Sequence, residues 1–401
     1  MGIERRVNVN TVGDEAHPSA APIADVEYVV AFDGPGLTSQ DILARRVNLN
    51  GAPISSVFRV NTYTSFTQDR PVVAADLAGN FVVIWRRFST ELVGQRFSFD
   101  ATPLGGEFQI NTSTFTVFNP TVARAPGGDF MVVWHSSEDG DYTGVQARRY
   151  AAGGAPAAPA FRVNTYTTGR QSYASVAAGS SGFLVMWASD SRVGEDKTGV
   201  YAQRYLASGA TVGGEFHVNT GTTGYTDSQN AAIRRSDGSF VIVWRGLDGT
   251  TDGVFGQRFD PSGALLGGEF AVNTTLANSQ RNAVVAFDTD STFVVIWQSG
   301  LQDGSGGGIY GRRYLFSGAP VSGEFRVNTT TTGYQYPPAV ASVQTHGRYL
   351  VSWGGPDGDQ GGVFDQAFCY VGDADSDGKI DVADVFFLIN LLFANGPPTV
   401  G

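Results

Sequence analysis

The feature that most constrains the fold is an apolar pentapeptide that the chain repeats along its length. Seven copies occur, and all six tryptophans of the 401 residues end a copy. Five apolar residues bounded by Gly- and Asp-rich turns predict a β-strand that is buried on both faces. The copies are YVVAF (28–32), FVVIW (81–85), FMVVW (130–134), FLVMW (183–187), FVIVW (240–244), FVVIW (293–297) and YLVSW (349–353).

Each repeat of roughly 53 residues contains four short segments of β-strand character. In the fifth repeat these are AAIRR, FVIVW, GVFGQRF and GGEFAVNT, joined by SDGS, RGLDGTTD and DPSG. Turns containing DG or SG between such segments indicate antiparallel neighbours. Four-stranded antiparallel units at this period predict an all-β fold, a seven-bladed β-propeller.

The last repeat lacks its fourth segment. Its third segment, GVFDQAF (362–368), is not followed by an EFxVNT sequence, whereas RRVNVNT (5–11) stands alone at the start of the chain. We therefore expect the N-terminal strand to complete the last blade, because this leaves no unpaired edge there. The propeller then covers residues 5–371, and residues 372–401 form a separate segment.

Charge and hydropathy exclude some classes of protein. The net charge of −11, without a cluster of cations, argues against a nucleic-acid-binding surface. No apolar run reaches the ~18 residues of a membrane span, and the sequence MGIERRVN lacks the apolar region of a signal peptide. The single cysteine, Cys369, excludes an internal disulfide framework and is expected to be buried near a strand end.

Residues that recur in most repeats are expected to be structural. The tryptophans should pack between blades, and the Asn of each VNT motif, such as Asn61, should satisfy backbone groups at a strand end. A recurring arginine should hydrogen-bond backbone or a neighbouring blade rather than bind substrate. It occurs at Arg46, Arg96, Arg149, Arg204, Arg258 and Arg313, but the seventh repeat has Ala367 there.

Long loops rich in Thr, Tyr, Asn and Gln join the fourth strand of one blade to the first strand of the next. Exposed aromatic rings beside amide and carboxylate groups suit a saccharide. The alternative is that these side chains pack only within their own loops. The candidate ligand-binding residues are Tyr63, Tyr166, Tyr225, Tyr334 and Tyr336.

A possible catalytic site lies where the first strands begin, at the mouth of the propeller channel. The residues there differ from blade to blade: His17, Asp69, Arg70, Asn119, Tyr173, Gln229, Arg281 and Tyr336. A histidine, an acid and two arginines could perform acid–base chemistry on an anionic sugar. No nucleophile elbow, HExxH or phosphate-loop motif is present.

The segment after the propeller carries a calcium-binding pattern. Acidic residues occupy positions 1, 3, 5, 9 and 12 of a loop that has Gly378 at position 6. Ca²⁺ takes six to eight oxygen ligands, and this spacing wraps the chain around the ion. The expected ligands are Asp373, Asp375, Asp377, Asp381, Asp384 and the carbonyl of Lys379.

This segment resembles one type I dockerin repeat, in which the loop runs into a helix. The resemblance implies a helix over Val382–Ala394 and a protein partner, either a cohesin-like domain or another chain. The helix is apolar nearly all round, so it should be covered. Dockerins have two such repeats, and this chain has one.

The propeller repeats resemble a VNTxT…FVVxW…GVxxQRY unit of large secreted bacterial proteins. The resemblance implies an extracellular location, at a bacterial surface or in its matrix. We therefore expect a non-enzymatic protein of recognition, adhesion or assembly, which binds a protein and possibly a polysaccharide. The alternatives are a polysaccharide-active enzyme that works at the channel mouth and a structural subunit that polymerises through the C-terminal tail.

Overall fold

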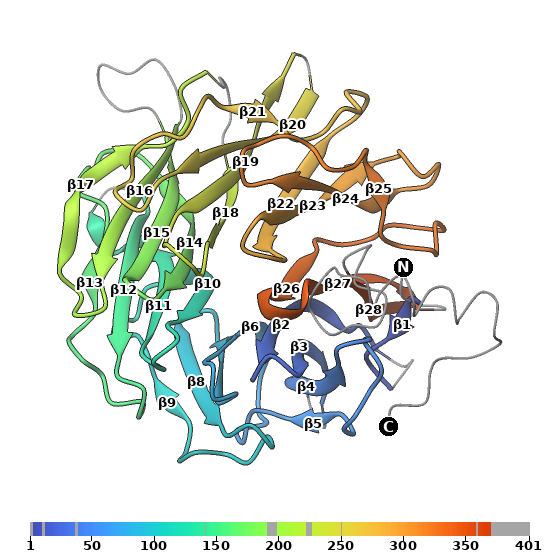
Figure 1. The fold of residues 1–401 in the computed structure, drawn as a ribbon. Helices are drawn as coiled ribbons and strands as arrows, with labels where there is room; N and C mark the ends of the chain where they lie inside the picture. Colours follow the sequence, from blue (N-terminus) through green and yellow to red (C-terminus); the bar gives the residue numbers. More distant parts are fainter. Residues whose placement is uncertain are drawn as a thin grey trace, which may run out of the picture.

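The protein is a ring of seven four-stranded antiparallel sheets (Figure 1). The structure is a computed structural model, and it describes residues 3–9, 13–36, 39–140, 142–190, 199–221, 227–249, 251–357 and 360–369. Within these ranges the chain contains strands and two short 3-10 helices, η1 (Ser137–Asp139) and η2 (Gln344–His346). The predicted seven-bladed β-propeller is confirmed, whereas the predicted C-terminal loop and helix lie outside the described residues.

In the first six blades the strands follow one another in the order of the sequence. The first three blades are β2 (Ala16–Ile23), β3 (Glu27–Pro35), β4 (Gln40–Asn48), β5 (Phe58–Arg59); β6 (Gln68–Ala75), β7 (Phe81–Arg87), β8 (Glu91–Phe97), β9 (Phe108–Gln109); and β10 (Val117–Arg124), β11 (Phe130–Ser136), β12 (Gly144–Tyr150), β13 (Phe161–Arg162). The next three are β14 (Gln171–Gly179), β15 (Gly182–Ser189), β16 (Gly199–Leu206), β17 (Thr211–His217); β18 (Asp227–Ile233), β19 (Phe240–Asp248), β20 (Thr251–Phe259), β21 (Phe270–Ala271); and β22 (Gln280–Phe287), β23 (Thr292–Gly300), β24 (Gly307–Leu315), β25 (Phe325–Arg326).

The N-terminal strand closes the ring, as the sequence predicts. The seventh blade consists of β26 (Ala339–Val343), β27 (Arg348–Asp357), β28 (Gln360–Cys369) and β1 (Arg5–Arg6). In β1, Arg5 lies opposite Asp365. The backbone N–H of Val363 then donates to the side chain of Asn8 at 3.1 Å, the role that Asn61 has in the first blade.

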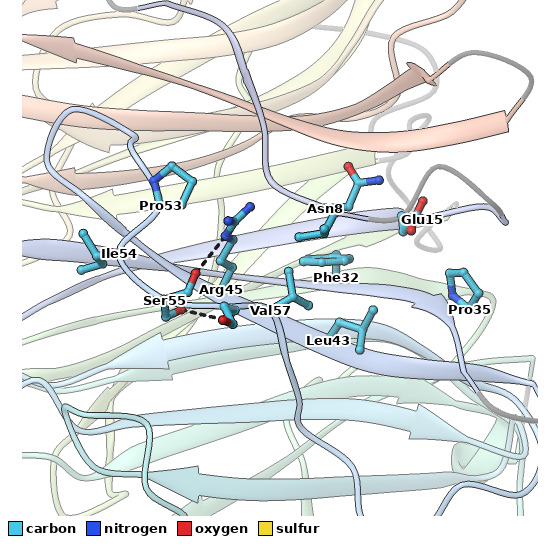
Figure 2. Close-up of a pocket in the computed structure, with 12 residues that line it drawn as sticks. Asn8, Glu15, Phe32, Pro35, Leu43, Arg45, Pro53, Ile54, Ser55 and Val57 are labelled. Atoms are coloured by element: carbon cyan, nitrogen blue, oxygen red, sulfur yellow. Dashed lines mark hydrogen bonds between the residues drawn. The ribbon is translucent and has the colours of Figure 1, made fainter.

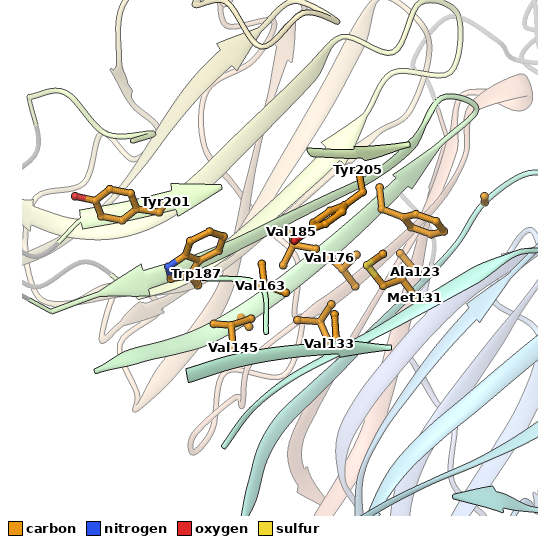
Figure 3. Close-up of a cluster of buried hydrophobic side chains, with 14 residues drawn as sticks. Ala123, Met131, Val133, Val145, Val163, Val176, Val185, Trp187, Tyr201 and Tyr205 are labelled. Carbon is orange, nitrogen blue, oxygen red and sulfur yellow. The ribbon is translucent and has the colours of Figure 1, made fainter. Parts of the chain in front are cut away.

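Apolar clusters fill every junction between neighbouring blades. Each of the seven clusters combines strands of two adjacent blades, and the six tryptophans are at most 1% exposed. Figure 3 shows the cluster in which Met131 and Val133 of the third blade meet Val176, Val185 and Trp187 of the fourth. The tryptophans are therefore inter-blade packing residues, and burial of their large side chains stabilises the ring.

The recurring arginine links neighbouring blades, as predicted. In three blades its guanidinium donates at 2.8 Å to a backbone carbonyl in a turn of the next blade. The three pairs are Arg149 with Ala207, Arg204 with Pro261 and Arg258 with Phe316. Arg46 and Arg313 instead pair with acids of their own blades.

The seventh blade replaces this arginine in another way. Ala367 has the arginine's place, and the neighbouring turn of the first blade contains Asn50. Arg5, from the closing strand, donates to the Asn50 carbonyl, and Arg348 donates to its side-chain oxygen at 2.6 Å. The substitution is therefore compensated at the seam where the two ends of the ring meet.

The end of β28 corrects one expectation from the sequence. Cys369 is exposed rather than buried, because it is the last residue of its strand and lies beyond the closing strand β1. In the part of the chain that the structure describes, no helix has the length and hydropathy of a membrane span.

Candidate active site at the channel mouth

The first strands of six blades bulge at the same point, near the channel mouth. There the pairing with the second strand shifts by one residue, and a residue other than glycine adopts a left-handed backbone conformation. These residues are His17 (φ 48°), Arg70 (54°), Asn119 (42°), Tyr173 (53°), Ser228 (51°) and Asn282 (55°). Bulges re-aim side chains, and residues held in this strained region gather at functional sites.

The second strands supply a matching set of side chains. In the six bulged blades, the residue directly after the buried tryptophan, or after Phe32, lies opposite the start of the bulge. Its chemistry changes from blade to blade: Asp33, Arg86, His135, Ala188, Arg245 and Gln298. The mouth is thus lined by two sets of variable residues on a repeated backbone.

His17 and Asp33 form the most reactive pair. Nδ1 of His17 lies 2.9 Å from Oδ2 of Asp33, and the His17 side chain is 46% exposed while that of Asp33 is 0% exposed. The backbone N–H of Arg70 donates to the same carboxylate oxygen at 3.1 Å. A carboxylate at Nδ1 fixes the ring and its tautomer, so Nε2 is the nitrogen available to accept a proton.

Two arginines adjoin this pair. Arg86 forms a bidentate ion pair with Asp69, with N–O distances of 2.8 and 2.5 Å. Hydrogen bonding to Asp69 raises the pKa of Arg86, and because Asp69 is occupied in this way it is poorly placed to act as a free acid. Arg70 donates to the side chain of Asn119 at 3.2 Å.

A second histidine, His135, lies in β11 of the third blade. His135 is buried, stacks on Phe118 at 5.2 Å between ring centroids, and lies 6.3 Å from the Tyr173 ring. Burial, with a smaller contribution from Arg170, lowers the pKa of His135 to about 4. His135 is therefore neutral at pH 7, beside the phenol of Tyr173.

The predicted ligand-binding tyrosines fall into separate places. Tyr334 and Tyr336 are exposed, and their ring centroids lie 5.7 Å apart. Arg281 of the mouth donates to the Tyr334 hydroxyl. Tyr63 is also exposed, and its ring packs against Phe88 under the guanidinium of Arg87. Tyr166 is half-buried in the loop between the third and fourth blades, and Tyr225 lies outside the described residues.

The other end of the channel is lined mainly by small apolar residues rather than by polar ones. Small apolar residues from all seven first strands line a cavity of about 310 Å³ there. An ion pair of 2.9 Å joins Arg235 of the fifth blade to Asp25 of the first, and Thr345 of the seventh donates to the same carboxylate. Blades that are not neighbours are thereby tied together across this end of the channel.

The structure places two further residues beside those predicted for the mouth, Asp33 and His135. Both directly follow the repeated pentapeptide within a second strand, so comparing the residue after each copy would have identified them as variable positions. Gln229 and Arg281 lie at the mouth, but the bulge residues beside them are Ser228 and Asn282.

No metal site is assigned to the described part of the chain. The expected calcium ligands, residues 373–384, lie outside it. Within it, no group of three or more His, Cys, Asp or Glu side chains is arranged to hold a metal ion.

Comparison with known proteins supports the architecture alone. No family model and no curated protein matches the chain. Solved structures that are similar include a protein of unknown function from Dyadobacter fermentans DSM 18053 (TM-score 0.54, 14% identity, 91% of this chain and 97% of that one). An α-L-arabinanase of Penicillium chrysogenum, complexed with arabinobiose, has a TM-score of 0.50 at 10% identity over 92% and 98% of the chains. An ulvan lyase of polysaccharide lyase family PL25 has a TM-score of 0.58 at 11% identity over 91% and 96%.

These neighbours contradict the expectation that the chain is not an enzyme. Two of the three are named as enzymes of polysaccharides, and they extend over nine-tenths of this chain. The expectation rested on the absence of a known catalytic motif and on the resemblance of the repeats and the tail to binding and attachment proteins. The alternative reading, an enzyme that uses the variable residues of the channel mouth, fits these neighbours better.

Proposed function

We propose that the protein is an enzyme that cleaves an anionic polysaccharide at the channel mouth. The observation that supports this best is the exposed His17, oriented by the fully buried Asp33, whose carboxylate also accepts from the backbone N–H of Arg70. An oriented imidazole is a general acid–base group at neutral pH, and a cation beside it favours a negatively charged sugar. The aligned ulvan lyase and arabinanase support a carbohydrate as the substrate class.

The charges at the mouth favour β-elimination over hydrolysis. Glycoside hydrolysis ordinarily uses two carboxyl groups on either side of the bond, but Asp33 and Asp69 are each held by other side chains. In elimination, His17 would take the proton at C5 of a uronate while Arg70 stabilises the charge that develops on its carboxylate. The C4–O bond then breaks, C4 and C5 become doubly bonded, and the leaving oxygen takes up a proton.

Tyr334 and Tyr336 provide a place for a neighbouring sugar. Both rings are exposed, and Arg281 connects them to the mouth. Stacking of a pyranose on such rings would hold the chain across the mouth. Tyr336→Ala should therefore raise KM more than it lowers kcat.

His17→Ala tests the catalytic proposal. Loss of a general base should lower kcat by about 10²–10⁴-fold, measured on uronate polysaccharides by the ultraviolet absorbance of the C4=C5 double bond. His346→Ala, at the turn of η2 toward the other end of the channel, is the matched control and should retain activity. New reducing ends without the ultraviolet signal would exclude elimination, and an active His17→Ala would exclude this site.

The C-terminal tail remains a separate proposal. We infer from its spacing that residues 373–384 bind Ca²⁺ and that the tail attaches the protein to an extracellular partner. Calorimetry should detect calcium binding that Asp373→Ala abolishes. Equal binding heats for the two proteins would contradict the calcium site.

A further inference from the structure

A glutamate joins neighbouring blades at five of the seven junctions. It stands directly before the Phe or Arg with which the fourth-strand pairing of one blade begins, within β17 in the case of Glu215. Its carboxylate accepts from the backbone N–H of a Thr that follows the Asn of the preceding blade. We call this contact the glutamate clasp. Its pairs are Glu107 with Thr62, Glu215 with Thr165, Glu269 with Thr220, Glu324 with Thr274 and Glu4 with Thr329.

Each clasp is a small carboxylate receptor. In four of the five, the hydroxyl of the same threonine also donates to the carboxylate, at 2.7–3.1 Å. The N–H of the following residue adds a further bond in four, at 3.0–3.3 Å. Two or three donors converging on one oxygen make a strong site for an anion.

The junction between the seventh and first blades has lost both partners. Val9 stands in the place of the threonine and Val57 in that of the glutamate, so an apolar pair replaces the polar one. A cavity of about 770 Å³ lies there, and Figure 2 shows Val57 and Arg45 on its wall. This junction offers no receptor.

The junction between the second and third blades has lost only the glutamate. Thr112 keeps its place, but Ala160 stands where the glutamate would be. Asn111 holds the Thr112 loop as in the clasped junctions: it accepts from the Leu92 N–H at 2.7 Å and donates to the Ser113 carbonyl at 3.0 Å. The Thr112 loop therefore has the conformation of the clasped junctions, but no glutamate supplies a carboxylate to it.

A cavity lies beside Ala160, where the glutamate side chain is missing, and the positively charged side chain of Arg148 lines it. It measures about 340 Å³ and is lined by Thr112, Arg148, Pro156, Ala158, Pro159 and Ala160. Nη1 of Arg148 donates to a backbone carbonyl at 2.6 Å, whereas its Nε is buried without a hydrogen-bond partner among the described residues. The equivalent Arg45 and Arg312 use their Nε atoms to bond carbonyls, at 3.1 and 3.2 Å.

We propose that this junction is a binding site for a carboxylate-bearing ligand, most suitably a uronate sugar. The ligand carboxylate would take the place of the glutamate on Thr112, and Arg148 would supply the balancing charge. The Thr112 donors lack the carboxylate that the clasped junctions supply, so a ligand that brings one gains charge-assisted hydrogen bonds beside the Arg148 cation. The inference stands apart from the catalytic proposal, because it rests on the second and third blades alone and involves binding without cleavage.

Titration with glucuronate tests the site. We expect saturable binding with a Kd in the millimolar range, which corresponds to a binding free energy of about −4 kcal/mol. Calorimetry and the NMR shift of the Thr112 amide measure it. Methyl glucoside, which lacks the charge, should not bind, and acetate should compete if the carboxylate alone is recognised. Failure of acetate to compete would mean that the sugar ring is needed as well.

Two variants decide the matter. Ala160→Glu should form a clasp within the chain, abolish glucuronate binding and raise Tm by about 1–3 °C. Glu215→Ala should lower Tm by a similar amount and open an equivalent receptor at Thr165, so acetate should restore part of the loss. Unchanged glucuronate binding in Ala160→Glu, or no binding by the wild type, would overturn the proposal whether or not His17→Ala is active.

Discussion

The second strand of each blade contains two adjacent positions that differ completely in what they tolerate. One holds phenylalanine (Phe32) in the first blade and tryptophan in the other six, always buried between blades. The next residue along is Asp33, Arg86 or His135 in the first three blades, and it differs again in most of the others. The difference teaches that the residues repeated in every blade stabilise the ring, whereas the residues that vary between blades set the chemistry of the mouth.

Substitution of a repeated residue should have the largest effect. Trp244→Ala should lower the free energy of unfolding by about 3–5 kcal/mol, because it empties a closely packed junction. Arg245→Ala, one residue along, should cost less than about 1 kcal/mol, since its ion pair with Asp252 is 3.6 Å long and partly exposed. Urea unfolding of both variants measures the two losses in the free energy of unfolding. Equal losses would contradict the contrast between the two positions.

The closing seam should make stability depend on pH. Burial is the main cause that raises the pKa of Glu15 to about 7, with a further contribution from Asp357. The folded state therefore holds this proton more tightly than the unfolded state does, and stability falls as pH rises from about 4.5 to 7. The loss from Glu15 should be no more than about 3 kcal/mol.

Glu15→Gln should remove that part of the dependence and stabilise the protein at pH 8. A weaker slope should remain, because burial also raises the pKa of Asp365 to about 7. Thermal unfolding from pH 4 to pH 8 provides the measurement. An unchanged profile in the variant would show that Glu15 titrates normally.

Asp33→Asn should affect catalysis without a matching loss of stability. The amide keeps the size of the buried side chain but no longer fixes the tautomer of His17 as the carboxylate does. We expect kcat to fall by about 10²-fold, with KM nearly unchanged. A loss confined to KM would make Asp33 a residue of substrate binding instead.

Arg5→Ala should have a small effect that is confined to the closing seam. It removes the hydrogen bond to Asn50 that compensates for Ala367, which costs about 1 kcal/mol. Hydrogen exchange should quicken first at β1 and β28, where the ring closes. Uniform quickening over all blades would contradict a local role for Arg5.

Blade number and ring closure were predictable because they depend on local patterns and on counting. The pentapeptide fixed seven second strands, and the missing fourth segment at the end matched the extra one at Arg5. The role of Arg5 opposite Asn50 was not predictable, since it requires the first and seventh blades to be placed side by side. Nor was the exposure of Cys369, which depends on how far β1 covers β28.

By itself the sequence determined the strands, their order and the residues that pack between blades, because burial and turn chemistry act over short stretches. Tertiary structure alone decided which variable side chains meet. His17 reaches Asp33 because a bulge turns it toward the second strand, and Arg70 joins them from the next blade. Contacts between blades depend on the curvature of the ring, which no single repeat encodes.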